Sequence, residues 1–429
     1  MPPTLSSILE ATSIIIDQSN AALSTPLCPP ANTNSSNSAQ LSLPLLSTSA
    51  ASLKAQTTKL SLLSVNTPFT PSALITVLSV VNESILPSLV TAALLTIPAE
   101  STQAFHNEAK LLVKDILREF GGLIEVVKVI ANGGSGGDNG KEVTVTEQQK
   151  GDVMACTGRL WKVCEQLLSF ADGGLAVFVV GKVRQYFELV RDGIRELEEW
   201  DPEEDDDDGE DDLFWDYEVA RNNGDELWCK ENKIFSKGSG MVKGKDKASG
   251  QGSEDDTTSA IAKLSFEKAH LLRLLNPIAQ IYPAIISHRL TRQNISSSPT
   301  CRDEQQKRHN SLSLSATQIS QLDHLLQHLR ELPNLVDEAA GSLYDHDIDN
   351  AVMYTNKLCK CAFAAAEVAR MPLIGSSNDN VRCKESGGND KGEENAPGEE
   401  DKFPKWADTW MRVVEEITRS KGKAKGVES

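Results

Sequence analysis

Apolar side chains recur every three or four residues along most of this chain, and polar stretches interrupt the pattern. This spacing places the apolar side chains on one face of an α-helix. The first half of the chain shows six such segments, at residues 5–23, 39–65, 71–97, 101–130, 153–171 and 177–200. The second half shows four more, at residues 260–292, 317–332, 333–370 and 404–419. Since no stretch of useful length alternates apolar and polar positions, we predict an all-α fold.

Proline and glycine mark where the predicted helices begin, bend and end. Pro71 stands at the first position of the third helix, and Pro87 is expected to kink that helix. Gly173-Gly174 is expected to turn the chain from the fifth helix into the sixth. Pro202 and the carboxylates of Glu203–Asp212 end the sixth helix, because like charges repel and little apolar surface remains to repay the entropy of ordering.

These interruptions divide the chain into two helical-bundle domains joined by an acidic disordered linker. We predict an N-terminal helical bundle at residues 1–200, an acidic and Gly-rich linker at 201–258, a C-terminal helical domain at 259–371 with a flexible loop at 293–310, a second disordered linker at 372–402, and a final helix at 403–420 that packs on the second domain.

The composition narrows the class of protein. Only 5% of residues are aromatic, so the cores are aliphatic. The formal net charge of −18 argues against direct binding of nucleic acid, because phosphate neutralisation needs clustered Lys and Arg. The eight cysteines follow no compact disulfide framework, and several fall within helical patterns, which is typical of a reducing compartment.

No segment of the sequence predicts insertion into a membrane. The apolar run Ile14-Ile15-Ile16 is flanked by acidic residues and preceded by no basic residue, unlike a signal peptide. The apolar stretch at residues 74–97 carries Asn82, Glu83 and Pro87 near its middle, which is costly in hydrocarbon and ordinary in a buried helix. We therefore expect a soluble protein.

Candidate catalytic and metal-ligating patterns are weak, and we predict no catalytic, cofactor-binding or metal site. The glycine run before Lys141 lacks the first Gly and the final Ser or Thr of a phosphate-binding loop, so a linker is the better interpretation. Three further groups can be read as metal ligands or as ordinary helix residues: His324 with His328, Cys359 with Cys361, and Asp345, Asp347 and Asp349. We interpret the two histidines as part of a solvated helix face and the two cysteines as packing residues. We interpret the three aspartates as carboxylates at the start of a helix.

One short pattern in the predicted linker has the form of a protein-docking peptide. Leu227, Cys229 and Glu231 follow acidic residues in the order Leu-x-Cys-x-Glu, which resembles the extended peptide that docks on retinoblastoma-type pocket domains. Three fixed residues also arise by chance in a long chain. These three residues are the candidate partner-binding residues of the sequence.

The order of helices, together with two local patterns, resembles one known family. These patterns are Leu160-Trp161-Lys162-Val163-Cys164 in the fifth predicted helix, and Val190-x-Asp192 followed by Glu196-Leu197-Glu198-Glu199 and Asp201-Pro202 before the acidic run. They are similar to the cyclin-D-binding protein family, also called GCIP or Maid. The similarity is clearest across residues 40–202, and we expect the chain to be a fungal-type member of this family.

This resemblance implies an all-helical protein whose N-terminal bundle is similar to vinculin and α-catenin modules and which has no enzymatic activity. Family members bind D-type cyclins and helix-loop-helix transcription factors, and regulate cell-cycle progression and transcription in nucleus and cytoplasm. We therefore expect a protein-binding regulator that sequesters a cyclin or helix-loop-helix partner. The alternative is a cytoskeletal or scaffolding adaptor, which rests on fold analogy alone.

Overall fold

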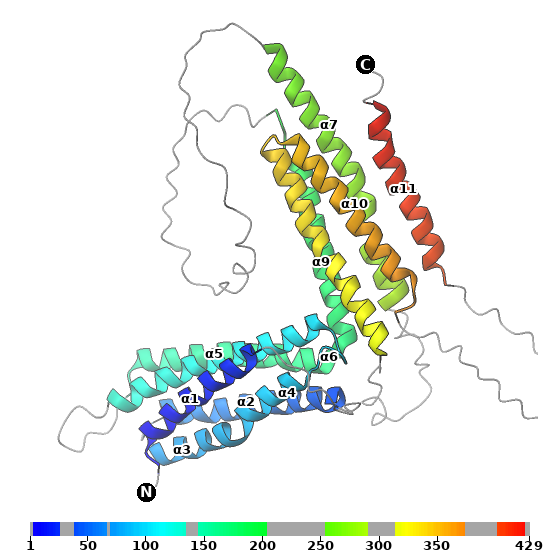
Figure 1. The fold of residues 1–429 in the computed structure, drawn as a ribbon. Coiled ribbons are helices and arrows are strands. Elements are labelled where there is room, and N and C mark those ends of the chain that lie inside the picture. Colours follow the sequence, from blue (N-terminus) through cyan, green and yellow to red (C-terminus); the bar gives the residue numbers. More distant parts are fainter. Residues whose placement is uncertain are drawn as a thin grey trace, which may run out of the picture.

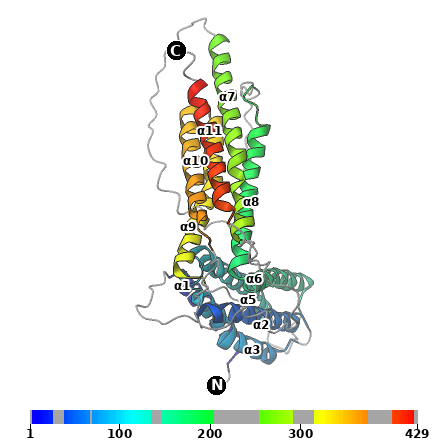
Figure 2. The same ribbon diagram turned by 90° about the vertical axis from the view of Figure 1, so that its right-hand side faces the viewer.

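The computed structural model describes residues 3–25, 38–66, 69–133, 145–203, 254–290, 314–373 and 401–424. Within these ranges every regular element is a helix, which confirms the all-α prediction. The helices form two bundles that stand across each other (Figures 1 and 2). Their bounds are α1 Leu5–Ser24, α2 Ser38–Val65, α3 Pro71–Val80, the π-helical turn η1 Val81–Ile85, α4 Leu86–Leu95, α5 Gln103–Gly133, α6 Glu147–Glu199, α7 Glu254–Ala279, α8 Ile281–Ile285, the π-helical turn η3 Ile286–Leu290, α9 Ala316–Tyr344, α10 Ile348–Arg370 and α11 Phe403–Ala424.

The N-terminal bundle comprises α1 to α5 and the first half of α6. Its core is almost entirely aliphatic, as the low aromatic content predicts; Phe120 lies within it, and Phe105 of α5 is buried as well. The face that the sequence predicts for residues 153–171 is the buried one, since Val153, Leu160 and Leu167 have no exposed surface. Burial of each such side chain stabilises the fold by about 1.5–3 kcal/mol before the entropy of ordering is subtracted.

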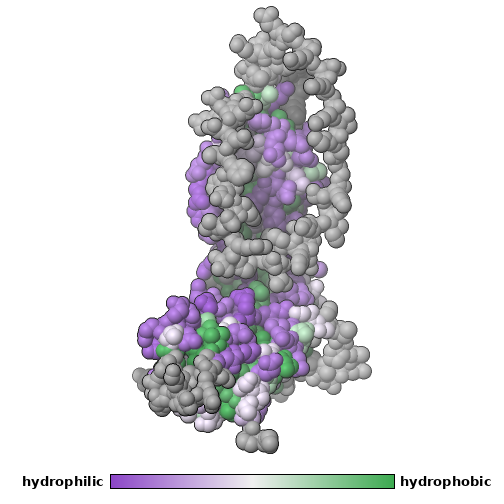
Figure 3. All heavy atoms as spheres, turned by 90° about the vertical axis from the view of Figure 1, so that its left-hand side faces the viewer, coloured by the Kyte–Doolittle hydropathy of each residue, from purple (hydrophilic) through white to green (hydrophobic). Residues whose placement is uncertain are grey.

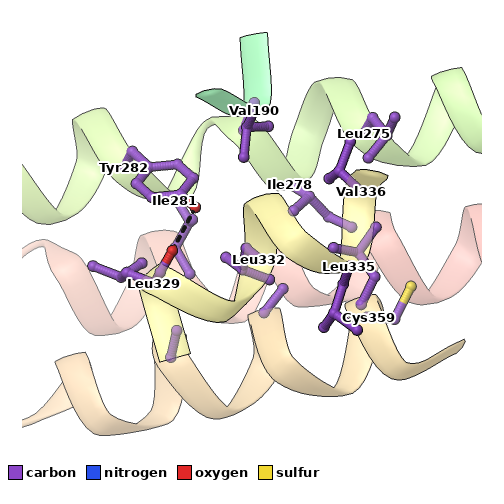
Figure 4. Close-up of a cluster of buried hydrophobic side chains, with 14 of the residues drawn as sticks. Val190, Leu275, Ile278, Ile281, Tyr282, Leu329, Leu332, Leu335, Val336 and Cys359 are labelled. Carbon is purple, nitrogen blue, oxygen red and sulfur yellow. Dashed lines mark hydrogen bonds between the residues drawn. The ribbon is translucent and has the colours of Figure 1, made fainter. Parts of the chain in front are cut away.

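The second bundle comprises the second half of α6 with α7 to α11. Figure 4 shows part of its core, where side chains from α6, α7, α8, α9 and α10 converge. α9 and α10 form an antiparallel pair along this bundle (Figure 1). The turn between them contains His346, whose φ of 59° is left-handed. This turn, and not the predicted boundary at residues 332 and 333, separates the two helices.

α9 continues through Pro333 because another side chain replaces the hydrogen bond that proline removes. A proline within a helix leaves the carbonyl four residues earlier without its N–H donor. In α9 that carbonyl belongs to Leu329, and it accepts a hydrogen bond of 2.9 Å from the hydroxyl of buried Tyr282 (Figure 4). The prediction of a helix boundary at Pro333 was therefore wrong, because the compensating donor comes from α8, about 50 residues earlier in the chain.

α6 belongs to both bundles. Val153 to Ala171 contribute to the first core, and Val179 to Leu197 contribute to the second. Between them the helix breaks at Gly174, with φ 63° and ψ −169°, a conformation that is essentially restricted to glycine. The turn predicted at Gly173-Gly174 is confirmed. The two cores consequently meet at Gly174 and not at residue 200, where the predicted N-terminal bundle ends.

An aromatic cluster holds the bend in α6, which we call the elbow. Phe170 precedes the bend and Phe178 follows it, and Phe105 of α5 contacts both rings, with centroid distances of 4.4 and 5.3 Å. The second bundle also reaches the start of α5, because the carboxylate of Asp323 accepts the backbone N–H of Gln103 at 3.0 Å. This contact satisfies one of the free N–H groups of the first helical turn.

Two other boundaries differ from the sequence prediction. The third predicted helix is divided by the π-helical turn η1, which Pro87 follows. The predicted irregularity at Pro87 is therefore accompanied by a wider helical turn just before it. α7 begins at Glu254, within the linker predicted at residues 201–258.

Two described segments, Pro71–Leu95 and Glu147–Glu199, are long and apolar enough to cross a bilayer by length and composition. Both contribute to the cores of the bundles. Leu74, Leu78 and Leu86 of the first segment have no exposed surface, and the second supplies apolar faces to both cores.

Candidate partner-binding surface

The candidate docking residues Leu227, Cys229 and Glu231 lie outside the described residues, in the stretch 204–253. The same holds for most of the acidic run, the glycine run before Lys141 and the flexible loop at 293–310. These parts of the sequence analysis therefore stay predictions.

The histidine and cysteine candidates lie together on α9 and α10 but form no complete metal site. The Sγ of Cys361 is 3.9 Å from Nδ1 of His328 and donates to the His328 carbonyl at 3.4 Å. Burial raises the pKa of the Cys361 thiol to about 11 and lowers the pKa of His328. In the parts of the chain that the structure describes, no three His, Cys, Asp or Glu side chains come together as metal ligands.

The aspartates between α9 and α10 act at helix ends. Asp347 is the N-cap of α10, and its Oδ1 accepts the backbone N–H of Asn350 at 3.0 Å. Asp349 lies in the first turn of the same helix, and Asp345 caps the end of α9. The interpretation as helix-start carboxylates is confirmed for Asp347 and Asp349, whereas Asp345 lies at the C-terminal end of α9.

The best candidate for a binding surface is the seam between α2 and α6 on the N-terminal bundle. The two helices run antiparallel, as successive polar contacts show: Ser47 with Asp172, Lys54 with Glu165, and Ser61 with Thr157. Lys54 is central to the seam, because its Nζ lies 2.6 Å from Glu165 and 5.8 Å from the centre of the Trp161 ring. The charged pair thus borders an aromatic ring.

Three large apolar side chains remain exposed along this seam. Trp161 is 36% exposed, Leu62 55% and Met154 66%. Trp161 and Met154 are seven residues apart and therefore lie on one side of α6, and Gly158 stands between them with open space where a Cβ would be. We call this surface, formed by Leu62, Met154 and Trp161 with Lys54 and Glu165, the Trp161 face. Aromatic and Met side chains of this kind are enriched in protein interfaces.

The Trp161 face was missed as a site in the sequence, although a signal was present. The buried stripe of the fifth predicted helix passes through Leu160 and Cys164, so Trp161 falls outside it. A tryptophan on the polar side of an amphipathic helix indicates a contact outside the helix's own core. The space-filling view shows other apolar residues scattered between hydrophilic ones on this bundle (Figure 3), so exposure alone does not identify the face.

A second candidate surface is a groove between α6 and α7. This groove has a volume of about 290 Å³ and is lined by Phe187, Arg191, Ile194, Arg195, Glu198, Asn276, Ala279 and Gln280. Arg191 and Arg195 each pair with an acidic residue of α6, at 3.2 and 2.9 Å, and all four side chains are more than half exposed. Exposed pairs of this kind are weak and exchange readily with other partners.

Comparison with known proteins identifies one family. Residues 45–203 match the family model described as Grap2 and cyclin-D-interacting, N-terminal. The matched range includes most of α2 and all of α3 to α6, and therefore all residues of the Trp161 face and the α6 side of the groove between α6 and α7. A search of curated proteins finds no match to the chain.

Proposed function

Because residues 45–203 carry the N-terminal domain of the GCIP family, we propose that this protein is a non-enzymatic regulator that binds a D-type cyclin. The match to that domain is the observation that carries the proposal. The family is a protein-interaction family, and its description names Grap2 and cyclin D as partners. Sequestration of the cyclin, in nucleus and cytoplasm, would restrain progression through the cell cycle.

The Trp161 face is the surface that we assign to the cyclin. It lies wholly within the matched range, and it presents an exposed ring beside an ion pair of side chains. Tryptophan is frequent among the few residues that dominate binding energy at interfaces, where truncation costs about 2 kcal/mol or more. A helix of the partner could rest on the small residues Gly151 and Gly158, where added Cβ atoms would meet nothing.

The first test is direct binding of the purified full-length chain to an immobilised D-type cyclin. The variant Met154→Ala/Trp161→Ala is expected to bind at least about 30-fold more weakly, which corresponds to about 2 kcal/mol. Met371→Ala is the control, because Met371 is similarly exposed but lies outside the matched range. No binding by the unaltered chain would refute the proposal, and equal binding by both variants would refute the assignment of the face.

Two further arms of the same experiment test the finer parts of the proposal. Leu227→Ala/Cys229→Ala/Glu231→Ala reports whether the docking pattern of the predicted linker contributes to binding. An immobilised helix-loop-helix factor tests the second class of partner. If the chain instead co-sediments with filamentous actin and binds neither partner, the adaptor function replaces the regulator.

A further inference from the structure

α11 occupies a site on the second bundle as a separate amphipathic helix. It is joined to α10 through residues 374–400 and lies along the outside of the bundle (Figures 1 and 2). One face of α11 is buried against α7 and α10, at positions i, i+4, i+7 and i+11, which are Phe403, Ala407, Trp410 and Val414. The site therefore binds a helix whose buried face carries, in order, a large aromatic, a small, a large aromatic and a medium-sized apolar side chain.

A buried arginine recognises the beginning of α11. The side chain of Arg289 is only 3% exposed, and it donates to the carbonyls of Ala369 and Arg370 at the end of α10. It also donates to the carbonyl of His288 at 3.4 Å and to both carboxylate oxygens of Asp401, at 3.0 and 2.9 Å. The Phe403 ring lies 4.5 Å from the guanidinium. Because a buried cation is costly without its counter-charge, this site requires a helix that brings a carboxylate.

Two further polar contacts fix the register of α11. Arg370 donates to Oδ1 of Asp408 at 2.5 Å, and the indole N–H of Trp410 donates to the carbonyl of Pro277 at 2.6 Å. Asp408 lies on α11, whereas Asp401 precedes the first residue of the helix by two positions. The site thus binds an acidic side chain two residues before Phe403, at Asp401, and another five residues after it, at Asp408.

A groove of about 500 Å³ is open beside α11, and α11 itself forms one of its walls. Trp406, Trp410 and Val413 of α11 line it, together with Pro277, Gln280, Pro283, Ala284, Ser287 and His288 from the end of α7 to η3. Residues 374–400 would span about 90 Å when extended, so α11 can leave the site without disturbing α10. A helix with larger side chains would bury more apolar surface there.

We propose that the surface of α7 and α10 under α11 is a binding site for an amphipathic helix of a partner protein, and that α11 is its own-chain occupant. The partner helix carries aromatic residues at i and i+7, a small residue at i+4, and acids at i−2 and i+5. α11 then competes with the partner and limits binding. This inference rests on the proposed function, in which the chain binds other proteins, but it concerns a different surface from the Trp161 face.

The test uses a fluorescently labelled peptide of residues 401–424 as the probe for helix binding. It is titrated with the full-length chain and with the full-length variant Asp401→Asn/Asp408→Asn. The variant weakens the docking of its own α11, whereas Arg289 and Arg370 stay intact to receive the acids of the peptide. The amide oxygen introduced at position 401 can still accept the N–H of Phe403, so the start of the helix keeps its cap. Glu415→Gln/Glu416→Gln is the matched control, because it removes the same charge from the exposed side of α11.

The peptide is expected to bind the Asp401→Asn/Asp408→Asn chain at least tenfold more tightly than the unaltered chain or the control. Equal affinity for all three chains, or binding to none, would overturn the proposal. Hydrogen exchange gives a second measurement that does not depend on the folding of a variant. Excess peptide should remove the protection of residues 403–424 in an isotope-labelled unaltered chain while α9 keeps its own, and unchanged protection would overturn the proposal. Neither experiment contains a cyclin, so their failure leaves the proposed function standing.

Discussion

The elbow in α6 predicts that a single added methyl group, in Gly174→Ala, destabilises the protein. In Gly174→Ala the added Cβ would meet only Leu43, at 3.9 Å, which is an ordinary van der Waals contact. The cost therefore comes from the backbone, because φ 63° with ψ −169° is essentially closed to residues with a side chain. Strain of this kind costs about 1–3 kcal/mol, and the stiffer unfolded chain offsets up to about 1 kcal/mol of that cost.

Gly181→Ala is the matched control, because it makes the same chemical change in the same helix. Gly181 lies within the regular part of α6, and a Cβ there would meet nothing within 4 Å. This variant should be more stable than the unaltered chain by up to about 1 kcal/mol, as alanine is the better helix former. The stiffening of the unfolded chain is common to both variants and cancels, so they are expected to differ by the cost of the strain, about 1–3 kcal/mol, in the free energy of unfolding.

Urea unfolding of both full-length variants, followed by far-ultraviolet circular dichroism, measures this difference. Equal free energies of unfolding, or a Gly174→Ala chain that is the more stable, would refute the reasoning. Small-angle scattering adds a separate check. If Gly174→Ala straightened α6 at little cost, the maximum dimension of the molecule would increase, and the aromatic cluster of Phe105, Phe170 and Phe178 would not be what holds the elbow.

Two further predictions follow from buried titratable groups. Desolvation raises the pKa of Asp323, whose folded state therefore takes up a proton before the unfolded chain does as the pH falls. The unaltered chain should gain stability relative to Asp323→Asn as the pH is lowered from 7 through that raised pKa, and urea titrations that show a constant difference would contradict this. Burial raises the pKa of Cys164 to about 12, so iodoacetamide at about pH 8 should modify this thiol only after denaturant is added. Peptide mass spectrometry checks this, and rapid labelling of Cys164 in the native chain would show that the thiol is accessible.

Much of the helical layout could be predicted from local signals, because capping and periodicity are properties of neighbouring residues. Pro71 opens α3, and α1, α2 and α11 begin within about one residue of their predicted positions. Boundaries that depend on tertiary contacts could not be predicted in this way. Pro333 predicts a break by every local rule, and only the hydroxyl of Tyr282 on another helix makes the continuous α9 possible.

The partition of the cores was also beyond the sequence pattern. The apolar stripe of residues 177–197 shows that this helix needs a partner, but periodicity does not say which bundle supplies it. In the structure, Val183 and Val190 pack in the second bundle. The predicted bend at Gly174 indicates a change of direction but not which core the following residues join. Likewise, exposed Trp161 could be recognised as a site only after its neighbour Lys54 was known from α2.

The sharing of α6 by both bundles has a thermodynamic consequence. Loss of the second bundle would leave the apolar face of Val179–Leu197 uncovered, and loss of the first would remove the anchor from which that half of α6 extends. The free energies of the two bundles are therefore linked, and a ligand that stabilises one also protects the other against unfolding. A chain cut at residue 203, where the family match ends, would lack this reciprocal support and is expected to aggregate through the uncovered stripe.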